Sequence, residues 1–396
     1  MTTNNNDSTT SFDDLPVEVA TEIFTRLPVK TLIRSTSVCK TWYSNITNPT
    51  FISAHIQHSL SCVNQTAILV IPLKYNKSCS LISAHTGQVF KNYKIPFTTK
   101  NGTVKLVASL SGVLSFNAFP VDEFGVPVVE DYQELYLWNP SVGKYKALFS
   151  SCFKKRGEGE FTYGVGLGVH ESSYDFRVVR VVCCKVGKLR PKVEVYSLRT
   201  NKWRKIRNPG VPRVAYNCGV PVGNSMVYWL ERNRGMSCFE EGYVVYFDFS
   251  REVFGQIKLP DDVCKCVGLR AEFTLMNFEG KLAVCVYDEA KERNGMKLLP
   301  CCIWLMSHED GKVSWTPRFK VVLREHACLF RLSRSGALLM LSASGSVQGL
   351  VSCDLNSQDL RLTKPLVTEP CSVDPSFVES LLMLEGRDEL LKSASS

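Results

Sequence analysis

The sequence predicts a small all-α domain followed by an all-β propeller, with six blades. Three observations support this fold class. Apolar residues recur at helical spacing up to residue 60, alternating or short apolar runs follow, and a strand–turn–strand unit returns about every 50 residues. We expect a disordered tail at 1–12, a helical domain at 13–60, a propeller at 61–385 and a second disordered tail at 386–396.

The helical domain is defined by its caps and its apolar spacing. Two aspartates precede Pro16 and predict the start of a first helix, whose apolar residues recur four apart until Pro28 stops it. A second helical pattern begins near Leu32 and ends at Asn48-Pro49, so two or three short helices are expected. Because a segment of ~45 residues rarely buries a sufficient core alone, it is expected either to cap the rest of the chain or to bind a partner.

Several residues of this segment follow the order and spacing of the F-box motif, which the segment therefore resembles. The matching pieces are Leu15-Pro16, Ile23, Arg26-Leu27-Pro28, Val38-Cys39-Lys40-x-Trp42, Phe51 and Ala54-His55. The resemblance implies docking through apolar anchors on a Skp-type adaptor of a cullin–RING ubiquitin ligase. The adaptor-contact positions that it implies are Leu15, Pro16, Ile23, Leu27, Pro28, Val38, Cys39 and Trp42. The family's Arg-Phe-Arg-Cys is replaced by residues 34–37, Arg-Ser-Thr-Ser, which predicts weaker docking.

Composition argues against several other kinds of protein. No run reaches the ~18 apolar residues of a membrane span, and residues 1–12 lack the apolar core of a signal peptide. The sixteen cysteines are therefore expected to be reduced thiols in the cytosol or nucleus, packed mostly in strands. None has C-x-x-C spacing, and His55 and His58 lack accompanying ligands, so we expect no metal and no cofactor.

Positive charge is concentrated in one part of the chain. Residues 1–60 hold four basic and five acidic groups and so carry a charge of −1. The remaining residues therefore carry +10, which gives the net charge of +9. Residues 177–213 hold twelve Lys and Arg against one acid, Glu194. Two interpretations stay open: a patch for an acidic or phosphorylated partner, for which Arg204, Lys205 and Arg207 are the candidates, and a solvated outer strand pair. No nucleic-acid-binding signature accompanies the charge.

The propeller is predicted from repeated pairs of strands. Hairpins are expected at 79–95, 135–148, 193–206, 244–257, 303–317 and 350–362, and second strand pairs at 104–116, 163–182, 215–230, 272–287 and 329–341. Each pair and the hairpin after it make one four-stranded blade, which gives five. Strand 67–73, the first hairpin and a C-terminal strand at 378–384 complete a sixth blade and close the ring. Seven blades is the alternative.

These strands also resemble the F-box-associated domain of a large plant family. The matching stretches are residues 137–145 (LWNPSVGKY), 163–166, 175–180, 195–204, 303–306 and 314–316. With the F-box, the resemblance covers about residues 14–385. The family's Asn-Gly turn is replaced by Ser111-Gly112, which keeps the turn glycine. The tryptophans of these strands are interpreted as packing between blades and not as an aromatic cage.

Long loops suggest where a substrate would bind. Segments 117–133, 149–162, 183–192, 231–243 and 288–299 would all leave the same face of the propeller, and binding sites commonly lie on such loops. Their charges have both signs, which suits protein recognition. The candidate substrate-binding residues on them are Asp122, Glu130, Asp131, Lys154, Lys155, Arg156, Arg232 and Arg234. Some of these loops could instead be mobile and solubilising.

Together these features favour a substrate-receptor subunit of a Skp–cullin–F-box ubiquitin ligase, in the cytoplasm and/or nucleus, that carries no catalytic residues. No G-x-S-x-G, H-E-x-x-H or phosphate-binding glycine loop is present. Two alternatives are a scaffold that binds the adaptor outside a ligase and a propeller enzyme with a metal. The second would need convergent Tyr, His and Cys residues near the axis, which the pattern does not assemble.

Overall fold

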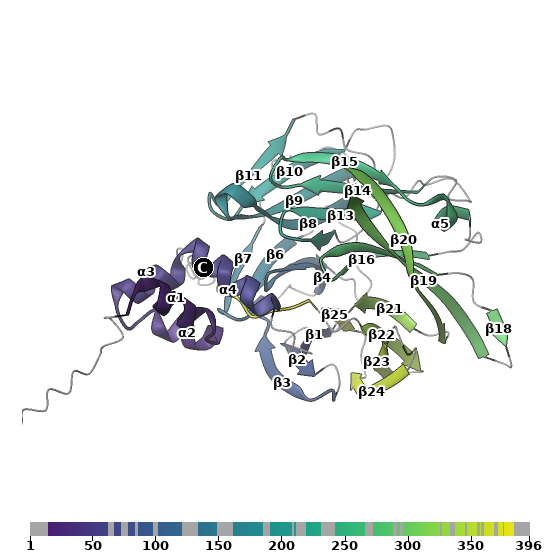
Figure 1. Cartoon of the computed structure of the whole chain (residues 1–396), viewed down its shortest axis with the longest axis horizontal. Helices are drawn as coiled ribbons and strands as arrows, with labels where there is room; N and C mark the ends of the chain where they lie inside the picture. The colour runs from purple at the N-terminus through teal and green to yellow at the C-terminus, as the bar shows by residue number, and fades with distance from the viewer. Residues whose placement is uncertain are drawn as a thin grey trace, which may run out of the picture.

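A computed structural model gives the fold of the chain (Figure 1). It describes residues 15–383 except 62–66, 73–77, 84–85, 98–101, 121–133, 149–160, 185–190, 208–209, 211–218, 231–241, 266–271, 288–290, 294–295, 310, 325–326, 333–336, 345–346, 355–356, 358–359, 368–370 and 375. None of the described helices is long and apolar enough to cross a membrane.

Four short helices form the N-terminal domain: α1 (Val17–Thr25), α2 (Val29–Ser35), α3 (Lys40–Thr47) and α4 (Pro49–Ser61). Pro16 takes the N-cap position of α1 without a side-chain hydrogen bond, and the predicted acidic cap, Asp13 and Asp14, lies outside the described residues. The spacing predicted two or three short helices before Asn48-Pro49, and three helices, α1 to α3, lie there. Cys39 begins a separate helix, α3, because its Sγ accepts from the Trp42 N–H at 3.4 Å.

The helices bury a small apolar core of their own. Phe24, Leu32, Ile46, Phe51 and Ile56 meet at its centre. The Phe24 ring also lies edge-on to Trp42, with the centroids 5.0 Å apart, so α1 is joined to both α3 and α4 by aromatic contacts. The core is too small to stabilise a large domain, and its remaining side is covered by other parts of the chain, described below.

The described strands form six antiparallel sheets. The first contains β25 (Cys371–Asp374), β1 (Ala67–Pro72), β2 (Ser78–Ser83) and β3 (Val89–Lys94). The second contains β4 (Gly102–Leu110), β5 (Val113–Pro120), β6 (Glu134–Asn139) and β7 (Lys144–Ala147). The third contains β8 (Phe161–His170), β9 (Asp175–Cys184), β10 (Lys192–Ser197) and β11 (Lys202–Ile206), with the short 3-10 helix η2 (Glu171–Ser173) between β8 and β9.

The other three sheets follow in chain order. The fourth contains β12 (Val220–Val222), β13 (Met226–Leu230), β14 (Tyr243–Asp248) and β15 (Val253–Lys258), and α5 (Asp261–Lys265) comes after it. The fifth contains β16 (Glu272–Phe278), β17 (Lys281–Tyr287), β19 (Met296–Glu309) and β20 (Lys312–Arg324), and β18 (Lys291–Arg293) also pairs with β19. The sixth contains β21 (Ala327–Leu332), β22 (Ala337–Ser344), β23 (Val347–Asp354) and β24 (Leu360–Val367).

The sheets are arranged as a propeller. Their first strands contact one another in order, β25 with β4, β4 with β8, β8 with β12, β12 with β16 and β16 with β21. Five sheets have the expected four strands, whereas the fifth in the ring departs from the pattern because β18 adds to it. Trp229 packs with valines of β9 and β10, which confirms for this tryptophan the predicted packing between blades.

The predicted C-terminal strand is wrong in its position. Residues 371–374, not 378–384, form the strand that pairs with β1, with Leu69 opposite Asp374 and Val70 opposite Val373. The strand ends at Asp374 because its Oδ1 accepts from the backbone N–H and the hydroxyl of Ser376, at 2.9 and 2.6 Å, which turns the chain. The described residues 376–383 contain no strand, and they run instead toward the helices.

Candidate functional site

Exposed apolar side chains gather on the helical domain. Leu15 and Ile23 are 36% and 38% exposed, and Val38, between α2 and α3, is 63% exposed. Pro16 and Pro28 are exposed as well. All five are among the eight adaptor-contact positions predicted from the sequence. Exposed apolar groups of this size on a small domain are typical of surfaces that contact another molecule, because water solvates them poorly.

The other three predicted contact positions take part in the domain's own packing. Leu27 and Trp42 are partly buried against the helical core, and Cys39 caps α3. These residues shape the surface from beneath, and only part of each side chain can reach a partner. The sequence interpretation also missed three exposed apolar residues, Val17, Val19 and Tyr43. Their exposure could not be predicted from helical spacing, since the residues on both sides of the apolar stripe are also apolar in this segment.

His55 ties the end of α1 to α4 from inside the domain. It is buried, and its Nε2 donates to the Leu27 carbonyl oxygen at 3.0 Å, while no partner of Nδ1 is found. Burial lowers the pKa of His55 below its ordinary value. The ring is therefore neutral at neutral pH and holds Leu27 in place through this hydrogen bond. Of the two alternatives for His55, a solvated or a packed residue, it is the packed one.

The helical domain sits on one particular side of the propeller (Figure 1). Its core includes Leu381, and Leu382 and Val142 pack against it. Val142 belongs to the turn between β6 and β7, which leaves the same face as the other short turns. The strand ends that border the connections β5–β6, β7–β8 and β13–β14 lie at the opposite face, because successive strands of an antiparallel sheet reverse direction. The described residues next to these predicted substrate loops are thus on the side away from the helices.

All eight substrate-binding residues predicted on those loops lie outside the described residues. They are Asp122, Glu130, Asp131, Lys154, Lys155, Arg156, Arg232 and Arg234. Of the three predicted in the basic stretch, Arg204 and Lys205 are exposed residues of β11 and Arg207 is exposed just after it. The structure therefore places only this last group, on the outermost strand of the third sheet.

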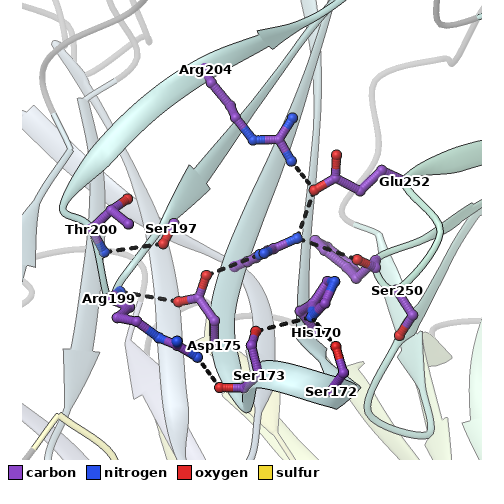
Figure 2. Close-up of polar contacts among 12 residues, drawn as sticks. His170, Ser172, Ser173, Asp175, Ser197, Arg199, Thr200, Arg204, Ser250 and Glu252 are labelled. Atoms are coloured by element: carbon purple, nitrogen blue, oxygen red, sulfur yellow. Dashed lines mark hydrogen bonds and ion pairs between the residues drawn. The ribbon is translucent and has the colours of Figure 1, made fainter.

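Part of the basic stretch is neutralised by carboxylates that lie outside it in the sequence (Figure 2). Arg177 contacts Asp175 at 3.0 Å and Glu252 at 2.6 Å, and Arg204 pairs with the same Glu252. Asp175 also accepts from the backbone N–H of Arg199 at 3.0 Å. The network joins turns of the third and fourth sheets, so a phosphate that approached Arg204 would compete with Glu252.

Another basic residue of that stretch, Arg180, is buried. Arg180 lies opposite Glu194 in the β9–β10 register, its Nε donates to Glu194 at 2.6 Å, and its guanidinium lies 4.4 Å from the ring centre of Trp203. Both charges are buried. The local count of twelve basic residues therefore overstates the charge available to a partner. Lys205 and Arg207 stay candidates for binding an acidic group.

The described residues hold no constellation for metal chemistry. No group of three or more His, Cys, Asp or Glu side chains within them is placed to hold a metal ion. Cys285 and Cys301 approach within 2.8 Å between their sulfur atoms, but both are buried in an apolar cluster with Cys353. The hydrogen bond with Cys285, together with burial, raises the pKa of the Cys301 thiol, which disfavours the reactive thiolate.

Comparison with known sequences finds relatives for both parts of the chain. Residues 12–56 match a family described as F-box-like, and residues 69–360 match one described as F-box associated beta propeller domain. The second match alone covers more than half of the 396 residues. The helical domain and the propeller seen in the structure correspond to these two regions in order.

Three relatives from Arabidopsis thaliana illustrate the degree of similarity. F-box protein CPR1 is 26% identical over 330 residues, which cover 78% of this chain and 73% of that protein. Another F-box protein is 23% identical over 400 residues, covering 93% and 89%. An F-box/kelch-repeat protein is 26% identical over 254 residues, and this match spans 62% of the chain and 61% of that relative, less than two thirds of its length.

Proposed function

Because the chain belongs to the plant F-box proteins that carry an F-box-associated propeller, we propose that it is the substrate-receptor subunit of a Skp–cullin–F-box ubiquitin ligase. The observation that supports this most directly is the exposed apolar surface of the F-box. Leu15, Ile23 and Val38 stay exposed although the domain has a buried core of its own. A helix-in-groove contact with a Skp-type adaptor would cover them.

The proposed mechanism is positional. The F-box binds the adaptor, and through it the cullin and the RING subunit, while the opposite face of the propeller holds a protein substrate. The chain contributes a high effective concentration of substrate and its orientation near the ubiquitin carrier, and no reacting group. The predicted loop residues, from Asp122 to Arg234, would provide the substrate contacts. Such a complex would work in the cytoplasm, the nucleus or both.

The ring is part of the proposal, since a rigid scaffold is what fixes the loops. We include all six sheets as blades of one closed ring, with β25 from the C-terminal region completing the sheet that begins with β1. Closing a ring with strands from both ends of the chain removes open sheet edges at its seam. The ordered contacts between neighbouring first strands, from β25 to β21, support the order of the blades.

Co-purification with a purified Skp-type adaptor tests the proposal. Ile23→Ala/Val38→Ala should lower the affinity at least about tenfold, because two exposed apolar anchors are truncated. Val89→Ala/Val253→Ala is the matched control, since these exposed valines lie on the propeller, and it should bind like the unmodified chain.

Equal binding by both variants would overturn the assignment of the surface, and no binding by the unmodified chain would overturn the function. Ubiquitin transfer, measured with the reconstituted cullin–RING complex, then distinguishes a receptor from a scaffold that binds the adaptor outside a ligase. A complex that assembles but transfers no ubiquitin to a bound protein would favour the scaffold.

A further inference from the structure

The chain leaves β25 and continues as a segment without regular structure that is nevertheless buried. We call residues 376–383 the strap. Phe377, Val378, Ser380 and Leu381 are all almost fully buried. A buried segment outside helices and sheets must find hydrogen-bond partners for its backbone elsewhere, because unpaired buried amides and carbonyls are costly.

Asn139 supplies those partners. This residue, at the end of β6, is fully buried, and its Nδ2 donates to the carbonyl oxygens of Ser380 at 3.0 Å and Leu382 at 2.8 Å. Its Oδ1 accepts from the backbone N–H of Ser141 at 2.9 Å, which orients the amide. The Ser141 hydroxyl in turn accepts from the Ser380 backbone N–H at 3.4 Å. Two side chains of the Trp-Asn-Pro-Ser stretch therefore hold both sides of the strap's backbone.

A second set of contacts holds the strap to the first sheet. Glu379 accepts from Lys91 at 2.7 Å and from the Tyr93 hydroxyl at 2.8 Å. Phe377 lies edge-on to Tyr93, with the centroids 6.1 Å apart, in the core between the first two sheets. At Gly112 an added Cβ would lie 2.4 Å from the Val378 carbonyl oxygen, and φ there is +79°, so only glycine lets the strap approach this turn.

The other side of the strap faces the F-box. Leu381 is fully buried in the F-box core with Phe24 and Leu32, and Leu382 packs against the same core. Among the described residues of that cluster, the members from outside the helical domain are Val142, Leu381 and Leu382. Two of the three belong to the strap. The contact between the F-box and the propeller is therefore made largely by the strap, which packs against both domains.

We propose that the strap fixes the orientation of the F-box on the propeller, with Asn139 and Ser141 as positioning residues. The consequence for ubiquitin transfer rests on the proposed function: the adaptor and the substrate face keep one relative orientation because this chain's own C-terminal segment holds them. Without the strap, Val142 is the remaining described residue of the propeller in the F-box core, and the covalent link between Ser61 at the end of α4 and Ala67 at the start of β1 is the other connection.

The test uses the full chain bound to its adaptor. A donor dye is placed on the adaptor and an acceptor dye on an unnatural amino acid that replaces the exposed Arg318 of β20. The unmodified chain should give one narrow distribution of transfer efficiencies. Asn139→Ala should broaden it, with adaptor affinity changed less than about twofold, because the F-box surface itself is not altered.

Asn277→Ala is the matched control. The Asn277 Nδ2 also donates to a backbone carbonyl, that of Pro221, at 3.0 Å, but it joins the fourth and fifth sheets away from the F-box. This variant should keep the narrow distribution. If Asn139→Ala does not fold, Leu381→Ala serves instead, since that side chain lies in the F-box core and in none of the sheets' cores.

An unchanged distribution in a folded strap variant would overturn the proposal. So would broadening by Asn277→Ala to the same extent, because that would show general loosening of the propeller. If the unmodified chain binds no adaptor, the proposed function fails separately. The strap is then tested by small-angle scattering of the chain alone, in which Asn139→Ala should increase the maximum dimension and Asn277→Ala should not.

Discussion

The buried pair of Arg180 and Glu194 offers a prediction whose size follows from the structure. Arg180 is 7% exposed, Glu194 is fully buried, and the two residues face each other across β9 and β10. Arg180→Met keeps most of the aliphatic stem but removes the guanidinium that contacts the buried Glu194 carboxylate. Removing one partner of such a pair costs about 3–5 kcal/mol, because the remaining charge is not solvated. We expect a loss of about 4 kcal/mol.

Unfolding in urea, followed by tryptophan fluorescence, measures this loss, and Trp203 beneath the guanidinium is one reporter. The double variant Arg180→Met/Glu194→Leu should recover most of the stability, because no uncompensated charge is left. Arg204→Met is the matched control. Its ion pair with Glu252 is half exposed and should contribute no more than about 1 kcal/mol.

Three results would refute this reasoning. The first is an Arg180→Met variant as stable as the unmodified chain, which would mean that Glu194 finds another partner or water. The second is a double variant no more stable than the single one, which would assign the loss to packing against Trp203 and not to charge. The third is an equal loss in Arg204→Met, which would remove the distinction between buried and exposed pairs.

Two further predictions concern the F-box and the ring. Because the pKa of His55 is lowered in the folded state, the unfolded state binds the proton first as the pH falls. The stability of the F-box should therefore be full above pH ~6.5 and should decrease as the pH drops below it. His55→Gln should flatten this pH dependence in thermal melts followed at 222 nm, and an unchanged slope would assign the dependence to other groups. Deleting 376–396 should leave β25 on β1 and the propeller soluble, whereas deleting 371–396 should expose the edge of β1 and cause aggregation, as measured by size-exclusion chromatography. Identical behaviour of the two truncations would contradict the assignment of β25 as the closing strand.

The strands were predictable because their signal is local. The hairpin expected at 193–206 is β10 and β11, and Asn201 adopts the left-handed conformation in its turn, with φ of 54°. Alternating burial and turn residues are properties of neighbouring positions, so a short window contains them. The hairpins and strand pairs of the other sheets were found in the same way, to within about five residues at their ends, except that β19 and β20 extend the hairpin expected at 303–317 to 296–324.

The errors arose where distant residues decide the outcome. The apolar run at 378–384 has the composition of a strand, but Asn139, 241 positions from Ser380, takes its backbone hydrogen bonds and the F-box takes its side chains. The basic stretch appeared as one patch because the carboxylate that neutralises Arg177 and Arg204 is Glu252, in another sheet. Neither partner lies in the window from which the prediction was made.

The order of the elements and the family could be predicted from the sequence alone, since they depend on spacing and residue type over short distances. The folded structure was needed to show which apolar side chains of the helical domain are exposed, which charges are neutralised and where the C-terminal segment lies. These properties depend on burial and on hydrogen-bond partners that folding brings together from far along the chain, and no local pattern records them.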